Sequence, residues 1–294
     1  MTILVTGAGG QVGRELVTRA GQRALVGLDR SQLDITDAGA VAAALSAHRV
    51  RLVVNAAAWT AVDRAESEPD ASWSVNRDGP AVLAAACAAL AVPLLHISTD
   101  YVFDGQSTSP YDEASAVAPL GVYGRSKWAG EQAIRDALPD RHVILRVAWV
   151  FGAHGGNFVR TMLRLGRERE ALSVVADQYG APTHAGAVAA ALLSIADRYG
   201  AQAALPWGTY HLSGTPVTTW HGFAESIFAE ASAAGLLARA PLVHPIPTEA
   251  YPLPAPRPAN SAFDCTLIRA RFGIEPTPWM AGLREVLNTW KQTS

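Results

Sequence analysis

Short apolar runs alternate with longer helical patterns through the first half of the chain. The runs have the length and composition of strands buried in a parallel sheet, and they lie at residues 3–5, 24–28, 52–54, 93–97 and 142–150. Helical patterns, several of them rich in alanine, lie between the runs at residues 12–20, 37–48, 69–90 and 123–138. Strands that alternate with helices form parallel βαβ units. The pattern therefore predicts an α/β fold with a Rossmann-type doubly wound parallel sheet.

The pattern loosens after residue 150 and predicts a smaller C-terminal α/β substrate domain. Helices are expected at residues 157–169, 185–199 and 220–234 and at the end of the chain, with a strand at 172–175. Residues 241–258 hold seven of the 18 prolines and predict an ordered, extended loop over a substrate. We expect a dinucleotide-binding domain at 1–150 with a return segment near 184–213, and a substrate domain at 151–183 and 214–294.

Composition excludes several classes of function. The net charge of −2 gives no electrostatic reason to bind nucleic acid or an anionic membrane. The two cysteines lack metal-ligand spacing and form no disulfide framework. The first residues lack a basic segment of the signal-peptide type, and the longest apolar run, at 81–95, is broken by Pro93. We expect a soluble, cytoplasmic protein.

A glycine cluster follows the first predicted strand directly. Gly7, Gly10 and Gly13 have the spacing that lets a backbone turn tightly and approach a pyrophosphate, and Gln11 and Val12 open the next helix. Strand, glycines and helix in this order predict a dinucleotide site. The alternative is an ordinary glycine-rich turn.

The ends of the next two strands supply further candidate cofactor contacts. Asp29 is placed to receive the adenosine ribose hydroxyls, whereas the adjacent Arg30 could meet a 2′-phosphate, so NAD and NADP both stay open. Asp34, followed by Ile35, either approaches the adenine or enters a helix. Small residues after the third strand leave room for a ligand, and this segment comprises Asn55, Ala56, Ala57 and Ala58.

Tyr123 and Lys127 carry the chemistry. Four residues apart on a helix, they lie on one face, and a positive charge beside a phenol favours phenolate. The chain has only two lysines, Lys127 and Lys291, among 24 Lys and Arg residues, which makes a chance pairing improbable. We predict a tuned acid with a lowered pKa. The alternative is a surface Tyr and Lys on an amphipathic helix.

Hydroxyl groups end the fourth strand. Ser98 and Thr99 face opposite ways along it, so one hydroxyl can face the crevice and hydrogen-bond a substrate carbonyl. The alternative is that both cap a turn. In the fifth strand, Trp149 either packs in the core or walls the pocket.

These motifs together resemble the extended short-chain dehydrogenase/reductase family. The resemblance runs essentially from end to end and is carried by residues 5–13, 55–63, 98–105 and 123–131. Later motifs resemble the branch of that family that reduces 4-keto nucleotide sugars, and they lie at residues 177–183, 218–221 and 257–261.

The resemblance implies a reaction and a role for each residue. The reaction is NAD(P)H-dependent reduction of the C4 keto group of dTDP-4-dehydro-L-rhamnose, with NADPH preferred and NADH also accepted. Thr99 would hydrogen-bond the carbonyl oxygen, Tyr123 would deliver the proton, and Lys127 would hold the nicotinamide ribose and lower the pKa of Tyr123. Residues 55–58 would line the cofactor. Contacts to the nucleotide sugar would come from Val102, Phe103, Trp149, Arg257 and Asn260.

Two alternatives and one departure accompany this resemblance. A 4-epimerase, another 4-reductase or a 4,6-dehydratase of the same family is the first, although Tyr101 stands where a dehydratase has Glu. A non-catalytic, NADP-binding regulatory subunit also keeps the Tyr and Lys, whereas residues 146–152 favour the reductase. Some relatives bind magnesium at a dimer interface through glutamates. Residues 184–189 hold no acid here, so we expect no metal and leave a homodimer open.

Overall fold

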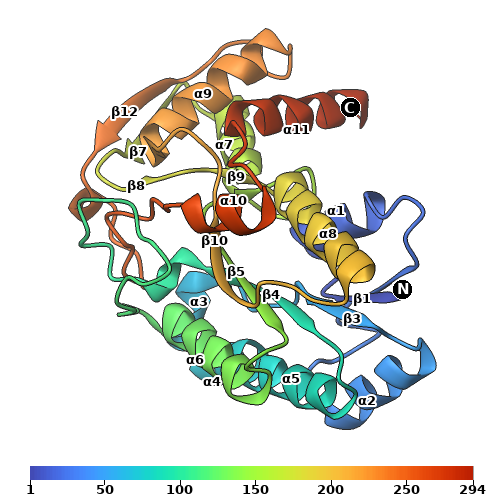
Figure 1. The fold of residues 1–294 in the computed structure, drawn as a ribbon. Coiled ribbons are helices and arrows are strands. Elements are labelled where there is room, and N and C mark those ends of the chain that lie inside the picture. The colour runs from blue at the N-terminus through green and yellow to red at the C-terminus, as the bar shows by residue number, and fades with distance from the viewer. Residues whose placement is uncertain (294) are drawn as a thin grey trace.

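A six-stranded parallel sheet forms the centre of the larger body of the molecule (Figure 1). The computed structural model describes residues 1–293. The strands run in the order β10-β5-β4-β3-β1-β2, with every neighbouring pair parallel. Their bounds are β1 Ile3–Thr6, β2 Leu25–Leu28, β3 Leu52–Asn55, β4 Leu94–Thr99, β5 His142–Val147 and β10 Gly208–Leu212. The predicted doubly wound α/β fold is confirmed.

Helices cover both faces of this sheet, which explains why the strands are mostly apolar. In β1, Ile3 and Val5 enter one core and Leu4 enters the other. One face is covered by α2 Ala38–Ala47, α5 Gly79–Ala89 and α6 Val122–Ala137. The other is covered by α1 Gln11–Thr18 and α8 Ala185–Gln202 (Figure 1).

The strand order reverses between β1 and β3. The chain passes from β1 outward to β2 and then returns to the other side of β1 to form β3. In sheets of this type, ligands bind in the crevice outside the carboxyl ends of the strands at such a reversal. The loops after β1 and β3 therefore meet where the glycine cluster and the Asn55 segment were expected to lie.

The long helix predicted for residues 69–90 is divided. It consists of α4 Pro69–Trp73, a π-helical turn at Ser74–Asp78 and α5, and the short helix α3 Val62–Ser67 precedes it. The π-helical turn places Asn76 so that its side chain accepts from Trp59 N at 2.9 Å and donates to Trp59 O at 3.0 Å. The turn thereby anchors the loop after β3.

A smaller body packs around α7 Phe158–Glu168, α9 Trp220–Ala233 and α11 Trp279–Thr293. Its parallel strand pair joins β7 Ala171–Val175 to β12 Leu242–Ile246. Short strands complete the chain at β6 Val150–Phe151, β8 Tyr179–Gly180, β9 Thr183–His184 and β11 Thr218–Thr219. Among the described residues, no helix is long and apolar enough to cross a membrane.

Two further predicted elements differ from the structure. The segment 241–258 was expected to be a loop, yet its first part is β12, because Pro245 is accepted in a strand of a two-stranded pair whose outer side needs no N–H donor. The strand predicted for residues 142–150 ends at Val147, because Trp149 adopts a positive φ of 50° that breaks it.

The chain returns from the smaller body to the larger one. Helix α8 packs on α1, and β10 extends the sheet beside β5. Helix α10 Thr266–Phe272 also packs on β10, although the predicted boundary assigns this segment to the substrate domain. We propose that residues 262–274 belong with the first domain, since Phe263, Cys265 and Ile268 lie in its core.

Candidate active site

The glycine cluster forms a backbone cradle at the reversal of strand order. Gly7 has φ +69°, and a Cβ there would lie 2.5 Å from Ala57 N in the loop after β3. A Cβ on Gly13 would lie 2.1 Å from Gly7 O. Helix α1 begins at Gln11 with no side-chain cap on Gly10, so its first N–H groups face the cradle. These features fit a dinucleotide pyrophosphate.

The candidate adenosine residues have local partners. Asp29 accepts from Ser31 N at 2.8 Å and from the Ser31 hydroxyl at 2.6 Å, and these bonds lower the pKa of its carboxyl. Asp34 accepts from Thr36 in the same way. The side chain of Ile35 differs from expectation, because it packs in the core against Gly79. Its backbone alone is left for an adenine.

Three more residues lie near the expected adenosine end of the cofactor, and two of them, Val12 and Arg14, belong to α1. Arg14 was not singled out from the sequence, yet its Nε donates to Gly9 O at 3.1 Å and its charge acts on Asp29. Val12 turns its side chain into the core, so only its backbone remains for the cofactor. Arg30 is exposed.

Asn55 organises the loop after β3 from beneath. Its side chain is buried, and its Oδ1 accepts from Thr6 Oγ1 at 2.7 Å and from Ala57 N at 3.0 Å. The Asn55 side chain therefore holds the backbone of the alanine segment in place, and the expectation that residues 55–58 line the cofactor stays a prediction. Ala56, Ala57 and Ala58 form that partly exposed backbone.

Helix α6 presents Tyr123 and Lys127 on one buried face, with 8% and 2% of each residue exposed. The helix starts after Gly121, which has no capping side chain, and Glu66 from α3 supplies the cap by accepting from Val122 N at 2.7 Å. The alternative of a surface Tyr–Lys pair is excluded by this burial.

Lys127 contacts β4 rather than the phenol. Its Nζ donates to Ile97 O at 2.7 Å and lies 3.3 Å from His96 Nε2. Burial lowers the pKa of Lys127 to about 8, although the charge of Glu131 opposes this shift. His96 was missed by the sequence analysis because a histidine inside an apolar strand gives no signal of its own.

The predicted lowering of the Tyr123 pKa is wrong for this structure. Burial raises it to about 12, the charge of Asp100 acts in the same direction, and the Thr99 side chain opposes both. Desolvation outweighs the ammonium because Lys127 is directed to β4. The phenol therefore stays protonated at neutral pH, which suits a proton donor.

Thr99 and Asp100 lie beside the phenol. Thr99 Oγ1 donates to Asp100 Oδ1 at 3.0 Å and also accepts from Tyr101 N at 3.3 Å. Asp100 is buried, and burial raises its pKa to about 6. Ser98 faces the other side of β4, as the alternation predicts, and is likewise buried.

A cleft of about 930 Å³ lies between the two bodies and reaches this site through Tyr101. The ring of Tyr101 meets that of Tyr123 edge-on, with 5.3 Å between centroids. Other residues that line the cleft include Phe158, Arg169, Gln178, Trp220, His244 and Arg257. The cleft combines aromatic surfaces with three basic side chains.

Comparison with known proteins identifies the family. The family model described as "RmlD substrate binding domain" matches residues 1–292. The chain belongs to this family. A relative from Burkholderia thailandensis, named dTDP-4-dehydrorhamnose reductase, is 46% identical over 286 residues, which cover 95% of each chain. One of the same name from Aggregatibacter actinomycetemcomitans is 43% identical and covers 97% of each chain.

Two solved structures share the fold over nearly the whole chain. A dTDP-4-dehydrorhamnose reductase from Clostridium acetobutylicum matches with a TM-score of 0.91 and 34% identity, covering 99% of this chain and 100% of the other. One from Bacillus anthracis, in complex with NADP, matches with 0.89 and 35% identity and covers 98% and 99%.

Three of the candidate sugar contacts of this RmlD-family chain point elsewhere. Val102 and Phe103 are buried in the core, where Phe103 stacks on Tyr111 at 4.3 Å. Asn260 donates to Ser107 O and Ser109 O, so it ties two loops together. For Val102 and Phe103 the physical cause is the turn after β4, which directs their side chains inward and leaves the outward position to Tyr101.

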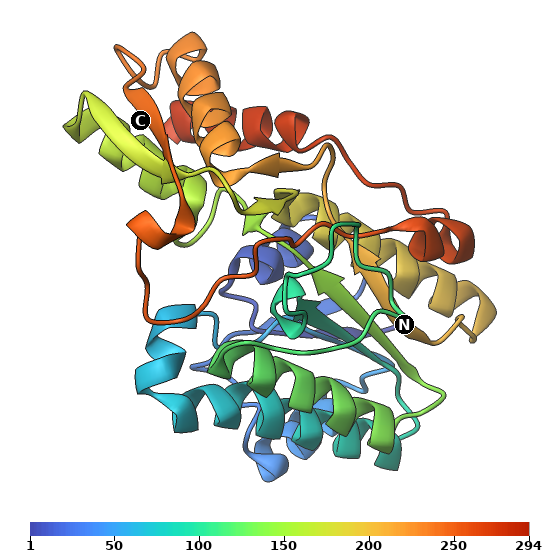
Figure 2. The ribbon, with the colours of Figure 1, turned by 90° about the vertical axis from the view of Figure 1, so that its left-hand side faces the viewer.

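The other two candidates lie at the cleft. Arg257 lines it, with Nη2 donating to Asp63 Oδ2 at 2.8 Å. Ala255 N donates to the same carboxylate, so the segment after β12 is held down onto α3 (Figure 2). Trp149 stacks on the cleft residue Trp220 at 3.6 Å, which places it behind the wall of the cleft.

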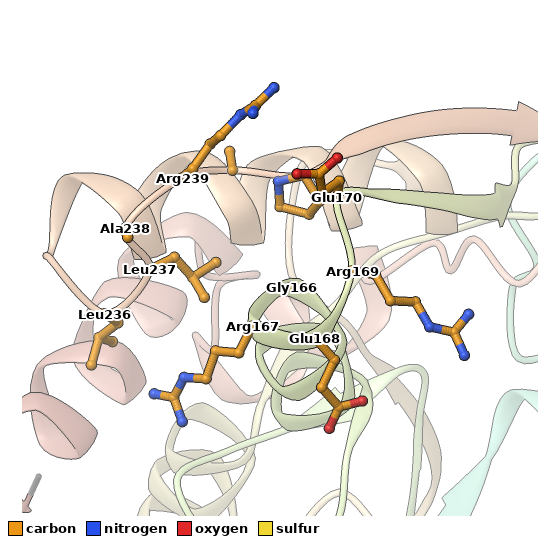
Figure 3. A pocket seen from close by; sticks show the side chains of 11 residues that line it. Gly166, Arg167, Glu168, Arg169, Glu170, Leu236, Leu237, Ala238 and Arg239 are labelled. Carbon is orange, nitrogen blue, oxygen red and sulfur yellow. The ribbon is translucent and has the colours of Figure 1, made fainter.

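A smaller hollow of about 360 Å³ lies between the end of α7 and residues 236–241 (Figure 3). The charged ends of Arg167, Arg169 and Arg239 point in different directions there. Polar groups that diverge do not form a ligand site.

Glu285, the acid of α11, has an ion-pair partner within this chain. Arg19 forms ion pairs with both Glu15 and Glu285. Within residues 1–293, no cluster of three or more His, Cys, Asp or Glu side chains has the geometry of a metal site.

Proposed function

We propose that the protein reduces the C4 keto group of dTDP-4-dehydro-L-rhamnose to give dTDP-L-rhamnose. The observation that carries this proposal is the burial of Tyr123 beside Thr99, next to a cleft of about 930 Å³ whose lining includes Tyr101, the ring neighbour of Tyr123. Membership of a family whose relatives are named for this reaction supports it.

The site residues would act on the carbonyl oxygen as negative charge develops there. Tyr123 would transfer its phenolic proton to that oxygen, and Thr99 would turn its hydroxyl from Asp100 toward it. Burial excludes water and strengthens both interactions. When bound, NADPH would supply the hydride.

We propose NADPH as the cofactor, with NADH also accepted. The cradle of Gly7, Gly10 and Gly13 would receive the pyrophosphate, and Lys127 would hold the nicotinamide ribose. Asp29 with Arg30 leaves both adenosine forms acceptable, while the Bacillus anthracis relative, solved with NADP, supports the phosphorylated one. A kcat/KM preference above about a thousandfold for either, roughly 4 kcal/mol, would contradict this mixed preference.

The basic and aromatic lining of the cleft would hold the nucleotide part of the substrate. Arg257 and Arg169 are placed to meet the diphosphate, and the rings of Trp220 and Phe158 offer surfaces for the base. Arg257 would leave Asp63 or bridge it to the phosphates.

The decisive experiment is NADPH oxidation with dTDP-4-dehydro-L-rhamnose, followed by identification of the product sugar. We expect turnover to dTDP-L-rhamnose. Cofactor binding without turnover on any keto sugar would overturn the proposal in favour of a binding subunit. Release of a 4-keto-6-deoxy sugar from dTDP-glucose alone would overturn it in favour of a dehydratase.

The name of one relative suggests a second candidate substrate for this protein. A Streptomyces niveus protein that is 43% identical over 76% of this chain is named dTDP-4-keto-6-deoxy-D-glucose reductase. The two substrates differ in sugar configuration, so a comparison of kcat/KM for both in the same assay decides between them.

We also propose a cytoplasmic location, and a homodimer stays open. Both described cysteines, Cys87 and Cys265, are free and buried, as is usual in a reducing compartment. Sedimentation velocity at micromolar concentration measures the oligomeric state directly. A single monomer species would exclude the dimer.

A further inference from the structure

A chain of buried polar side chains runs from β1 to Lys127. Thr6 Oγ1 donates to Asn55 Oδ1 at 2.7 Å, Asn55 Nδ2 lies 3.0 Å from His96 Nδ1, and His96 Nε2 lies 3.3 Å from Lys127 Nζ. All four side chains are buried. The mechanism above gives His96 no role, although its imidazole is in direct contact with the lysine that follows Tyr123 by four residues.

The donors in this chain fix the tautomer of His96. The amide of Ala57 can only donate, and it donates to Asn55 Oδ1, so the other terminal atom of Asn55 must be the NH₂ group. That group donates to His96 Nδ1, which therefore accepts. Burial and the charge of Lys127 lower the pKa of His96, so the ring is neutral and carries its proton on Nε2.

This tautomer presents an N–H bond to Lys127. An ammonium group has three donors and no acceptor, so it meets the Nε2–H group as a second donor. A neutral amine accepts from Nε2–H with its lone pair and still donates to Ile97 O at 2.7 Å. The contacts are thus all satisfied only when Lys127 has released its third proton.

We propose that His96 is a positioning residue that faces Lys127 with an N–H bond and weakens the hold of Lys127 on its proton. Thr6, Asn55 and Ala57 act through His96 by fixing its tautomer. This rests on the proposed function only for the role of Lys127 in catalysis. The claim that His96 favours loss of a proton from Lys127 depends only on the contacts from Asn55 to His96 and from His96 to Lys127.

The surrounding charges act in both directions. On α6, Glu131 raises the pKa of Lys127, but it is itself paired with Arg146 from β5 through bonds of 2.9 and 2.7 Å. From the start of β5, His142 acts on His96 and favours its neutral form. Tyr123 on α6 is protonated and uncharged at neutral pH.

The chain offers an unusually direct test, because it has only two lysines. Lysine labelled with ¹³C at Cε gives two NMR signals, and Lys291→Arg identifies the one from Lys127. We expect the Lys127 signal to titrate with a midpoint near pH 8 in the wild-type protein. Histidine labelled with ¹⁵N should show the Nε2–H tautomer for the signal that disappears in His96→Phe.

Asn55→Asp should invert the tautomer. A carboxylate still accepts from Thr6 and Ala57 but attracts a proton to His96 Nδ1, so Nε2 becomes an acceptor for the ammonium group. We expect the Lys127 midpoint to rise by about one unit or more, as expected for an added favourable charge-assisted contact. The alkaline limit of kcat should move upward with it, whereas a merely structural defect lowers kcat at every pH.

The negative charge that Asn55→Asp introduces is controlled by a double-mutant cycle with His96→Phe. If Asn55→Asp raises the Lys127 midpoint equally with and without the imidazole, the effect is coulombic and the proposal fails. It also fails if His96 carries its proton on Nδ1 in the wild-type protein, a result that needs no variant at position 55 to fold. These NMR readouts are independent of turnover, so an inactive wild-type enzyme would contradict the proposed function alone.

Discussion

At the scale of single residues, burial decides the chemistry of this site more than the spacing of charges. Tyr123 and Lys127 share a helix face as predicted, but the ammonium group is directed to Ile97 and His96. The spacing of two residues along a helix predicts whether their side chains lie on the same face of that helix. The direction of its terminal atoms depends on partners from other strands, which a single sequence does not reveal.

Tyr123→Phe should lower kcat by about 10²–10⁴-fold, because it removes the proton donor while the ring still packs against Tyr101. Binding of NADPH and of the nucleotide sugar should persist, as measured by calorimetry. Tyr199→Phe is the control, since it removes a phenol of α8 that lies against Trp207, and it should keep wild-type turnover. A Tyr123→Phe enzyme with near wild-type kcat would refute the assigned role.

Asp100 should make the protein less stable as pH rises from about 4 to 6. Its pKa is near its ordinary value of about 3.9 when unfolded and about 6 when folded, so the folded state binds more protons in that window. The free energy of unfolding should fall by up to about 3 kcal/mol from this group. Urea unfolding of wild type and Asp100→Asn at pH 4, 5, 6 and 7 measures the difference.

Relative to wild type, the free energy of unfolding of Asp100→Asn should rise by this amount between about pH 4 and pH 6. Above that window the difference between the two proteins should stay constant. A stability difference that does not change between pH 4 and 7 would show that the folded-state pKa of Asp100 is not raised.

At the scale of elements, close backbone contacts fix how α6 sits on its neighbours. A Cβ on Gly124, one residue after Tyr123, would lie 2.1 Å from Tyr101 O. Gly124→Ala should therefore cost about 1–3 kcal/mol through overpacking, measured by chemical denaturation. Gly156 is the matched control, since a Cβ there meets nothing within 4 Å. Equal effects at both glycines would contradict the contact.

The strands show which parts of the fold can be predicted from the sequence alone. Apolar runs located all of the first five sheet strands, because strands covered on both faces are mostly apolar. Strand β10 was anticipated only as a return segment, since Gly208–Leu212 mixes polar and apolar residues at the sheet edge. The strand β12 was hidden by its prolines, and Phe103 was assigned to the pocket because a strand end gives no sign of which way the next turn points.

At the scale of the whole molecule, one ion pair connects the segment after β12 to the larger body. Asp63→Asn should remove the Arg257 contact and speed amide hydrogen exchange in residues 250–258, with less than about 1 kcal/mol lost in global stability, because both groups are partly exposed. Glu68→Gln, which breaks the ion pair of Glu68 with Arg64 at the end of α3, is the control and should leave that exchange unchanged. Unaltered exchange in Asp63→Asn would show that other contacts hold the segment.

The position of β10 beside β5 also bears on how the chain is made. During synthesis, β5 leaves the ribosome about 65 residues before the strand that covers its outer edge, a delay on the order of seconds. For that time, an apolar strand with open N–H and C=O groups is available to other nascent chains. Fragments that end near residue 150 should therefore aggregate, and a chaperone that shields β5 during that interval should raise the yield of folded protein.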